Sequence, residues 1–470
     1  MGSHERIFVL SDLHIAPPSR LSNFNAGPEL VAFLNHLPAG STLVLAGDTF
    51  DFLELPNRPG TLHLATAPDL CERLLDGIET KHPWGPAFFA ALGSLGERNI
   101  RCVLLPGNHD PELYHPDAEV VLQKKIGLNG HDPALSIHRA SGAWRAEVGG
   151  QKVIVLHGHL EDDWNRIDPD TVHRALAQGK ASLPLPPGSL LVLETINAYE
   201  RAMDLEGRPR FPFVSLLKPE GPWVPLLLLA LDPGLARRHI PSFAGHGFTA
   251  LLRALRHRVV GGGPFLGRGV RGPSAASEEG AFERRSDEEE AGSFDWADEL
   301  AGAIDEALTP EERASPELTL DRLEHSLRSG DEVAVRSGYL SGGFGMPAGP
   351  LLRAAWRKWH DGGKFFDTAA PSDHDRALIQ KYLPHDVRNT IVVNGHTHAA
   401  REEHLSGFRT YLNTGTWTDL MGVPEKGDTE TLEGWLGQLR SGAAPQRKRR
   451  HYAEIRPEGG RLGEWKGIGA

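Results

Sequence analysis

Cysteine is scarce in this chain of 470 residues, where Cys71 and Cys102 are the only two. They do not form a CxxC pair, and Cys102 lies inside an apolar run typical of a buried strand. A disulfide framework is therefore not expected, and a reducing compartment is favoured. Residues 1–10 enter a strand almost at once, which leaves no room for a secretory signal, so we expect cytoplasmic localisation.

Long hydrophobic runs and excess positive charge are also lacking. The strongly apolar stretch 223–231 is far shorter than the ~20 residues that span a bilayer, so it predicts a buried helix and no transmembrane segment. The 62 acidic residues outnumber the 50 basic ones, which gives a formal net charge of −12. Phosphate backbones require clustered positive charge, so nucleic acid is not an expected partner.

Alternating strand and helix patterns from residue 5 to about 160 predict a layered α/β fold, of the α+β kind. Apolar runs predict strands at 7–10, 42–45, 102–105 and 153–156, and helices begin near a proline at 28–37, 68–80, 86–98 and 116–126. The Gly149-Gly150 pair between 144–148 and 152–156 predicts a hairpin, so part of the sheet is antiparallel. Further strands follow only at 390–393, 409–412 and 452–455.

This spacing predicts a split core, formed by residues 1–160 and 388–470, around a helical insertion at 161–388. Within the insertion, residues 183–187 read as a proline-broken connector and 261–293 as a disordered linker. Helices are expected at 190–203, 296–307, 318–327, 351–359 and 372–383, the last with Ser372 as its N-cap. Within residues 248–258 the apolar residues recur at helical spacing and the basic residues lie on the other face, which predicts a packed helix with a solvated basic face. Contact of this helix with a membrane surface or an anionic substrate is the alternative.

Polar side chains follow five of these predicted strands where each strand ends. They are Asp12 and His14, Asp48, Asn108 with His109 and Asp110, His157, and His396 and His398. One Asp-x-His motif can be a simple turn, but together these motifs supply carboxylate, amide and imidazole donors at one sheet edge, where ligands of open α/β sheets bind. The set is large enough for two adjacent divalent cations.

The order D-x-H, GD, GNHD, H, GHxH resembles the calcineurin-like metallophosphoesterases over residues 5–160 and 388–420. The resemblance implies a four-layer β-sandwich flanked by helices and two divalent metal ions, manganese foremost, with iron or zinc as alternatives. It implies these ligands: Asp12, His14 and His398 for one cation, Asn108, His157 and His396 for the other, and Asp48 for both. It also implies hydrolysis of a phosphodiester, phosphomonoester or pyrophosphate by a metal-bridging hydroxide.

Four further residues receive expected roles. The resemblance implies that His109 contacts the phosphate and assists the leaving group, which suits a side chain whose pKa is near neutrality. We expect Asp110 to orient His109, and Asp51 either to support the site or to cap a turn. For His159 two roles stay open, either a contact in the site or a plain polar residue of a loop.

The substrate is less well defined by the motifs. A helical insertion before Gly395-His396-Thr397-His398 resembles the UDP-2,3-diacylglucosamine diphosphatase branch, which implies a lipid-linked substrate, with peripheral membrane contact through the insertion. The chain departs from that branch in carrying His109 where arginine is common, and its insertion is longer. A phosphorylated small molecule is the other substrate class, and a nuclease or a non-catalytic binding scaffold on the same fold are the alternative functions.

Overall fold

The computed structural model describes most of the chain, in two compact units. The described residues are 6–19, 22–130, 132–204, 206–217, 223–232, 254–256, 258–259, 296–329, 348–362, 371–443 and 446–467. The first unit contains residues 1–222, 359–426 and 433–470, and the second contains residues 223–358 and 427–432. Residues 161–222 thus fall within the first unit, and the predicted assignment of 161–388 to one insertion stays a prediction.

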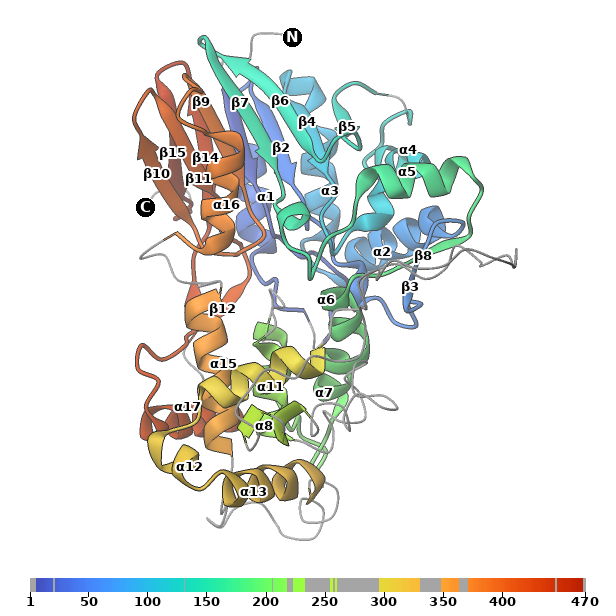
Figure 1. The fold of residues 1–470 in the computed structure, drawn as a ribbon. Coiled ribbons are helices and arrows are strands. Elements are labelled where there is room, and N and C mark those ends of the chain that lie inside the picture. The colour runs from blue at the N-terminus through green and yellow to red at the C-terminus, as the bar shows by residue number, and fades with distance from the viewer. Residues whose placement is uncertain are drawn as a thin grey trace, which may run out of the picture. The chain divides into compact units, whose positions relative to one another are not determined.

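The first sheet of the larger unit carries the N-terminal strands (Figure 1). Its order is β15 (Gly459–Glu464), β14 (His451–Arg456), β1 (Ile7–Leu10), β2 (Thr42–Ala46), β4 (Arg101–Leu105) and β5 (Leu135–Ile137). The strands β1, β2, β4 and β5 are parallel, whereas β14 runs antiparallel to β1. The chains that leave β1, β2 and β4 therefore emerge at one edge of the sheet.

The second sheet joins segments far apart in the sequence. Its order is β10 (Arg401–Leu405), β11 (Arg409–Asn413), β9 (Thr390–Asn394), β7 (Gln151–Leu156) and β6 (Ala143–Val148). The predicted β6–β7 hairpin is confirmed, and the chain turns at Gly149 and Gly150, which both have positive φ. Strand β9 pairs parallel to β7, so the loops that follow them start at the same edge.

Alternation along β1 shows how the layers are held together. Ile7 and Val9 pack with Val153, Ile391 and other residues of the second sheet, whereas Phe8 and Leu10 pack with the helices on the opposite face. Successive strand residues point to opposite faces, so a strand buried on both sides must be apolar throughout. This packing confirms the predicted layered α/β fold.

Helices cover the outer faces of both sheets. Those on the first sheet are α1 (Gly27–His36), α2 (Ala67–Lys81), α3 (Gly85–Gly93) and α4 (Pro116–Lys125), and the second sheet packs against α16 (Asp373–Tyr382). The helix predicted at 86–98 ends at Gly93, and a separate 3-10 turn follows at Gly96–Arg98. Ser372 is the N-cap of α16, as predicted, in a capping box with Asp375.

Residues 161–217 extend the first unit. They form α5 (Pro169–Ala177), β8 (Ser182–Pro184), α6 (Pro187–Leu190), a π-helical segment at Leu191–Ile196 and α7 (Asn197–Arg201). The predicted connector at 183–187 is wrong at its start, because β8 pairs with β3 (Thr61–His63). Ser189 and Asn197 hydrogen-bond to the backbone carbonyls of Asn108 and Leu53, which joins this segment to the strand-end loops.

The second unit is helical in its described part. It contains α8 (Val224–Leu231), α11 (Trp296–Glu306), α12 (Pro310–Ala314), α13 (Pro316–Ser329) and parts of α15 (Ala348–Gly362) and α17 (Thr429–Ser441). Every residue of α8 is buried, which confirms the prediction for 223–231. The predicted linker 261–293 and most of the helix predicted at 248–258 lie outside the described residues. Within the described residues, no helix is both long and apolar enough to cross a membrane.

Candidate metal centre

The structure brings together all seven side chains predicted as metal ligands at the edge where β1, β2, β4, β7 and β9 end. Each is at most 2% exposed: Asp12, His14, Asp48, Asn108, His157, His396 and His398. Backbone hydrogen bonds align the loops, since Asp12 N–H donates to Gly47 O and Gly395 N–H donates to His157 O. The side chains therefore converge because the strands that precede them are parallel neighbours within each sheet and the two sheets pack against each other.

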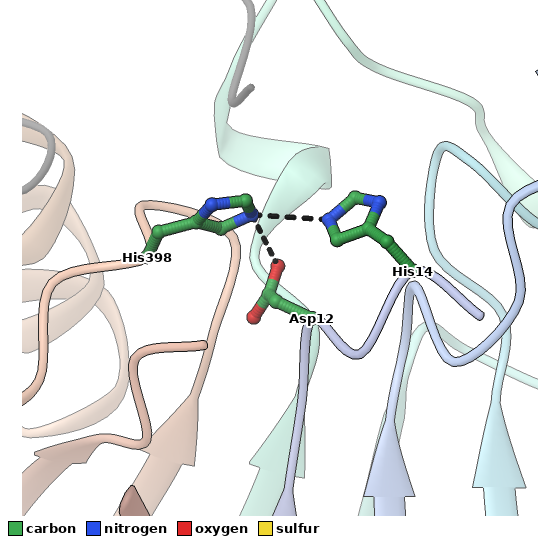
Figure 2. A group of neighbouring side chains, drawn as sticks. All are labelled: Asp12, His14 and His398. Carbon is green, nitrogen blue, oxygen red and sulfur yellow. Dashed lines mark hydrogen bonds and ion pairs between the residues drawn. The ribbon is translucent and has the colours of Figure 1, made fainter. Parts of the chain in front are cut away.

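The first cluster consists of Asp12, His14 and His398 (Figure 2). His14 Nε2 lies 3.1 Å from His398 Nε2, and His398 Nε2 lies 3.3 Å from Asp12 Oδ1. Two imidazole nitrogens that face each other at this distance compete for one proton, whereas a divalent cation accepts electron pairs from both. The cluster thus has the donor chemistry of a cation site.

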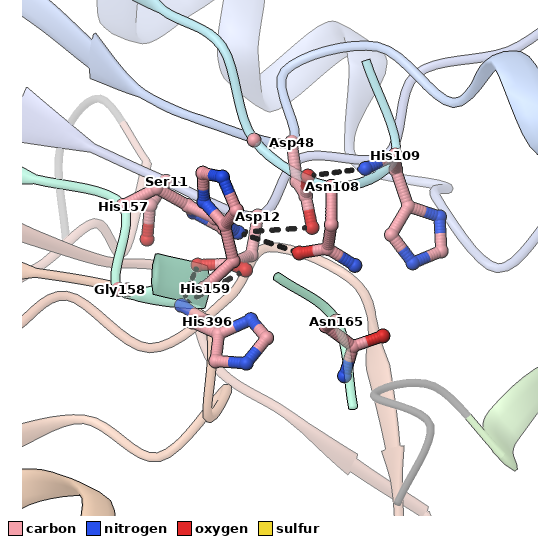
Figure 3. A network of polar contacts seen from close by, with 12 residues as sticks. Ser11, Asp12, Asp48, Asn108, His109, His157, Gly158, His159, Asn165 and His396 are labelled. Carbon is pink, nitrogen blue, oxygen red and sulfur yellow. Dashed lines mark hydrogen bonds and ion pairs between the residues drawn. The ribbon is translucent and has the colours of Figure 1, made fainter. Parts of the chain in front are cut away.

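The second cluster consists of Asp48, Asn108 and His157 (Figure 3). His157 Nε2 lies 3.2 Å from both Asp48 Oδ2 and Asn108 Oδ1, and His157 Nδ1 lies 3.0 Å from Ala46 O. The carbonyl can only accept, so Nδ1–H is the donor and the ring is oriented with Nε2 toward the two oxygens. Asp12 and Asp48 also lie close enough to His157 for the three to share a cation.

Donor separations in both clusters fit common cations. Ligand bonds of ~2.0–2.1 Å at angles between octahedral and tetrahedral values place adjacent donors ~2.8–3.4 Å apart. The separations of 3.1, 3.3 and 3.2 Å fall within that interval. These three donor pairs therefore have separations that suit a shared divalent metal ion.

His396 occupies a different position from the other six. Its backbone N–H lies 3.1 and 3.0 Å from the two Asp12 oxygens, and its ring lies 5.2 Å from the His157 ring, centroid to centroid. Its Nε2 faces Asp162 Oδ2 at 2.9 Å. Among the described residues, the compact groups of carboxylate and imidazole atoms that could hold a metal do not include His396.

Backbone strain is concentrated at these residues. Ten described residues other than glycine have positive φ, and five of them are predicted ligands: Asp12 (53°), His14 (50°), Asp48 (49°), His396 (68°) and His398 (56°). This left-handed conformation costs roughly 1–3 kcal/mol per residue and persists only where the surroundings enforce it. The concentration of strain here is typical of functional sites.

Two motif glycines allow the loops to approach. A Cβ at Gly107 would lie 2.1 Å from Asp48 Oδ1, and a Cβ at Gly395 would lie 2.1 Å from both Asp12 Oδ2 and the Ser11 hydroxyl oxygen. Each glycine therefore makes room for an aspartate that follows another strand.

Asp51 connects the first cluster with His109. Asp51 Oδ2 lies 3.2 Å from His14 Nδ1 and 3.1 Å from His109 Nδ1, and Oδ1 accepts from Leu53 N–H. One Asp51 oxygen thus caps a 3-10 turn, and the other contacts two imidazoles. The His14 and His109 rings meet edge to face, with centroids 4.5 Å apart.

Asp110 is placed differently from the expectation. Its carboxylate accepts from the backbone N–H groups of Gly107, Thr49 and Phe50, at 2.6, 2.9 and 3.2 Å. It therefore ties the loop after β4 to the loop after β2, and the carboxylate at the His109 ring belongs to Asp51. Proximity in sequence suggested the wrong partner, because the Asp110 carboxylate is occupied by backbone N–H groups of the two loops.

Three residues after β7 extend the polar network. His159 is buried, with Nε2 3.3 Å from Ile167 O and its ring 5.3 Å from that of His157, so it is not a solvated loop residue. Asp162 contacts His396, and Asn165 Nδ2 donates to Asp162 Oδ2 at 2.9 Å. The only sequence signal for Asp162 was its position just after His157-Gly158-His159, since its partner is remote in the chain.

The two clusters differ in electrostatics. Burial and the nearby His109 lower the pKa of His14 to about 4. Burial also acts to lower the pKa of His157, but the Asp48 carboxylate outweighs it and raises that pKa to about 9. Burial opposes ionisation of Asp48, yet His157 and His109 hold its pKa well below the usual value. Asp48 and His157 thus attract each other as a buried pair, and a divalent cation held by both would displace the proton from His157 Nε2.

A comparison with known protein families agrees with the motifs. Residues 5–193 match the family model described as calcineurin-like phosphoesterase, which confirms the resemblance over that part of the chain. The matched segment ends before His396 and His398, which β9 brings to the same edge. No curated protein matches the chain.

Proposed function

We propose that the chain is a dinuclear metal-dependent phosphoesterase that hydrolyses a phosphodiester, phosphomonoester or pyrophosphate bond. In this proposal Asp12, His14 and His398 hold one cation, Asn108, His157 and His396 hold the other, and Asp48 is shared. When bound, the cations would withdraw charge from phosphoryl oxygens and lower the pKa of a coordinated water.

The position of Asp48 is the observation that carries the proposal. Asp48 Oδ2 lies 3.2 Å from His157 Nε2 of its own cluster and 3.9 Å from His14 Nε2 of the first cluster, so a single oxygen faces a histidine of each. Its other oxygen accepts from His109 N–H at 2.8 Å, which fixes the orientation of the carboxylate. A carboxylate is the donor in this set best able to serve two cations and offset their charge.

His109 is the proposed proton donor to the leaving group. Asp51 at Nδ1 sets the ring orientation and makes Nε2 the nitrogen directed away from that carboxylate. An imidazole held by a carboxylate is suited to transfer a proton near neutral pH. Asp110 supports this arrangement indirectly by holding the loop that carries Asn108 and His109.

Manganese is the first cation to test, with iron and zinc next, because mixed oxygen and imidazole donors accept all three. The substrate class covers phosphorylated small molecules and lipid-linked phosphoesters, which the same two-cation chemistry hydrolyses. We place this activity in the cytoplasm, where both buried cysteines, Cys71 and Cys102, would stay reduced.

The test compares wild type with His109→Ala on a bis-aryl phosphodiester in Mn²⁺. Loss of a general acid should lower kcat by roughly 10²–10⁴-fold while metal content per chain stays unchanged. His404→Ala is the matched control, because His404 is an exposed histidine on β10 and should keep full activity. A wild-type chain that binds metal but hydrolyses neither this ester nor a panel of monoesters and pyrophosphates would contradict the proposal.

A further inference from the structure

Asp162 lies five residues after the predicted ligand His157 and contacts the imidazole of His396. Its Oδ2 lies 2.9 Å from His396 Nε2, and the two side chains come from segments that follow β7 and β9. The His396 ring also packs against the His157 and His374 rings, with centroids 5.2 and 5.3 Å away. The imidazole is therefore confined on several sides.

The Asp162 carboxylate is itself fixed by hydrogen bonds. Oδ1 accepts from Trp164 N–H at 3.0 Å, and Oδ2 accepts from Asn165 Nδ2 at 2.9 Å in addition to its contact with His396. Asn165 is fully buried, and its N–H donates to Asp162 O, so the turn closes on itself. Because these hydrogen bonds fix the carboxylate, the His396 ring keeps its contact with Asp162 only in this orientation.

The groups that contact the Asp162 carboxylate are all hydrogen-bond donors or, for the His396 imidazole, able to donate: Trp164 N–H, Asn165 Nδ2 and His396 Nε2. An asparagine at position 162 would place its NH₂ group against another donor, either Trp164 N–H on one side or Asn165 Nδ2 and His396 Nε2 on the other. Only a carboxylate offers acceptors on both sides, and its charge favours a proton on His396 Nε2. With that proton on Nε2, Nδ1 is the nitrogen whose electron pair can be donated to a cation.

We propose that Asp162 is a positioning residue that selects Nδ1 of His396 as the ligand atom for the second cation. This proposal rests on the two-cation site of the proposed function. Histidine ligands commonly donate their other N–H to a carboxylate, and loss of that partner weakens metal binding by roughly 10–100-fold. Asp162 would thus determine the affinity of the second cation and leave the first cluster unchanged.

The test is a Mn²⁺ titration of the full-length, metal-stripped protein by calorimetry, with no substrate present. Wild type should bind two Mn²⁺ per chain. Asp162→Ala and Asp162→Asn should both bind the second Mn²⁺ roughly 10–100-fold more weakly and keep the first affinity within about threefold. The visible spectrum of the Co²⁺-loaded protein should change in the same variants, since one ligand nitrogen is altered.

Asp163→Asn is the matched control, because Asp163 is the adjacent exposed aspartate, and it should bind both cations as wild type does. Wild-type affinity for the second cation in Asp162→Ala, or equal weakening of both sites, would overturn the proposal. If Asp162→Ala does not fold, Asp162→Asn decides the question. A wild type that binds two cations but hydrolyses no ester would contradict the proposed function alone.

Discussion

The two clusters of the candidate metal centre hold their histidines in different ways. His14 in the first cluster has Asp51 at its second ring nitrogen, and Asp51 also contacts His109. His157 in the second cluster has only the neutral carbonyl of Ala46 there. The first cluster is therefore coupled to the ring of the proposed proton donor through a carboxylate, whereas the His157 ring is oriented by a backbone carbonyl. Two histidine ligands can thus differ in function because the second nitrogen of each ring has a different hydrogen-bond partner.

Asp48→Asn should have the largest effect, because it removes the carboxylate between the clusters and so acts on both. Several kcal/mol of charge stabilisation depend on the cations, so we expect kcat to fall on the order of 10³-fold. Metal content measured by mass spectrometry should fall below two per chain. The control is Asp69→Asn on the exposed face of α2, and unchanged metal content in Asp48→Asn would argue against a shared carboxylate.

His398→Ala and His396→Ala should separate the clusters. His398→Ala should lose the cation of the first cluster and His396→Ala that of the second, so each variant should retain about one cation per chain. Calorimetry on each variant measures which affinity survives. Loss of both cations in either variant would show that the clusters are not independent.

Gly395→Ala should destabilise the fold where the two sheets meet. Its Cβ would fall 2.1 Å from Asp12 Oδ2, and overpacking of a filled site lowers the free energy of unfolding by roughly 1–3 kcal/mol. Denaturant unfolding of the apo protein measures this change. Gly434→Ala, on the exposed face of α17 with nothing near its Cβ, should instead stabilise by about 0.5–1 kcal/mol. Equal effects from both would refute the steric argument.

Asp168→Ala should have the smallest effect and should leave both clusters unchanged. Asp168 caps α5 by accepting from Thr171 N–H, and loss of such a cap costs roughly 0.5–2 kcal/mol. The bond from the Thr171 side chain lowers the pKa of Asp168 below its usual value. Its contribution is therefore full above the unfolded pKa of ~3.9 and is lost as pH falls through the folded pKa. Unfolding curves at pH 7 and pH 3 check this, and a difference that grows on acidification would contradict it.

Much of the first unit could be predicted from local patterns. The strand Ile7–Leu10 and the hairpin around Gly149 and Gly150 have the predicted places, because apolar runs and turn glycines act over a few residues. Strand β8 was missed because its three residues gain their stability from β3, far away in the chain. Asp110 was predicted to orient His109, but the carboxylate at the His109 ring belongs to Asp51. Both residues are aspartates, so the sequence alone does not tell which of them reaches the ring.

By itself, the sequence determined the donor types and the strand ends that carry them, because apolar strands followed by Asp, Asn and His are local features. The tertiary structure decided which donors meet. The parallel pairing of β9 with β7 brings His396 and His398 to Asp12 and His157, although His396 and His398 lie outside the segment that matches the family. The tertiary structure also decided which group contacts a ring nitrogen of each histidine: Asp51 at His14, Ala46 O at His157 and Asp162 at His396. Contacts of this kind depend on the packing of loops that are distant in sequence, which no local pattern encodes.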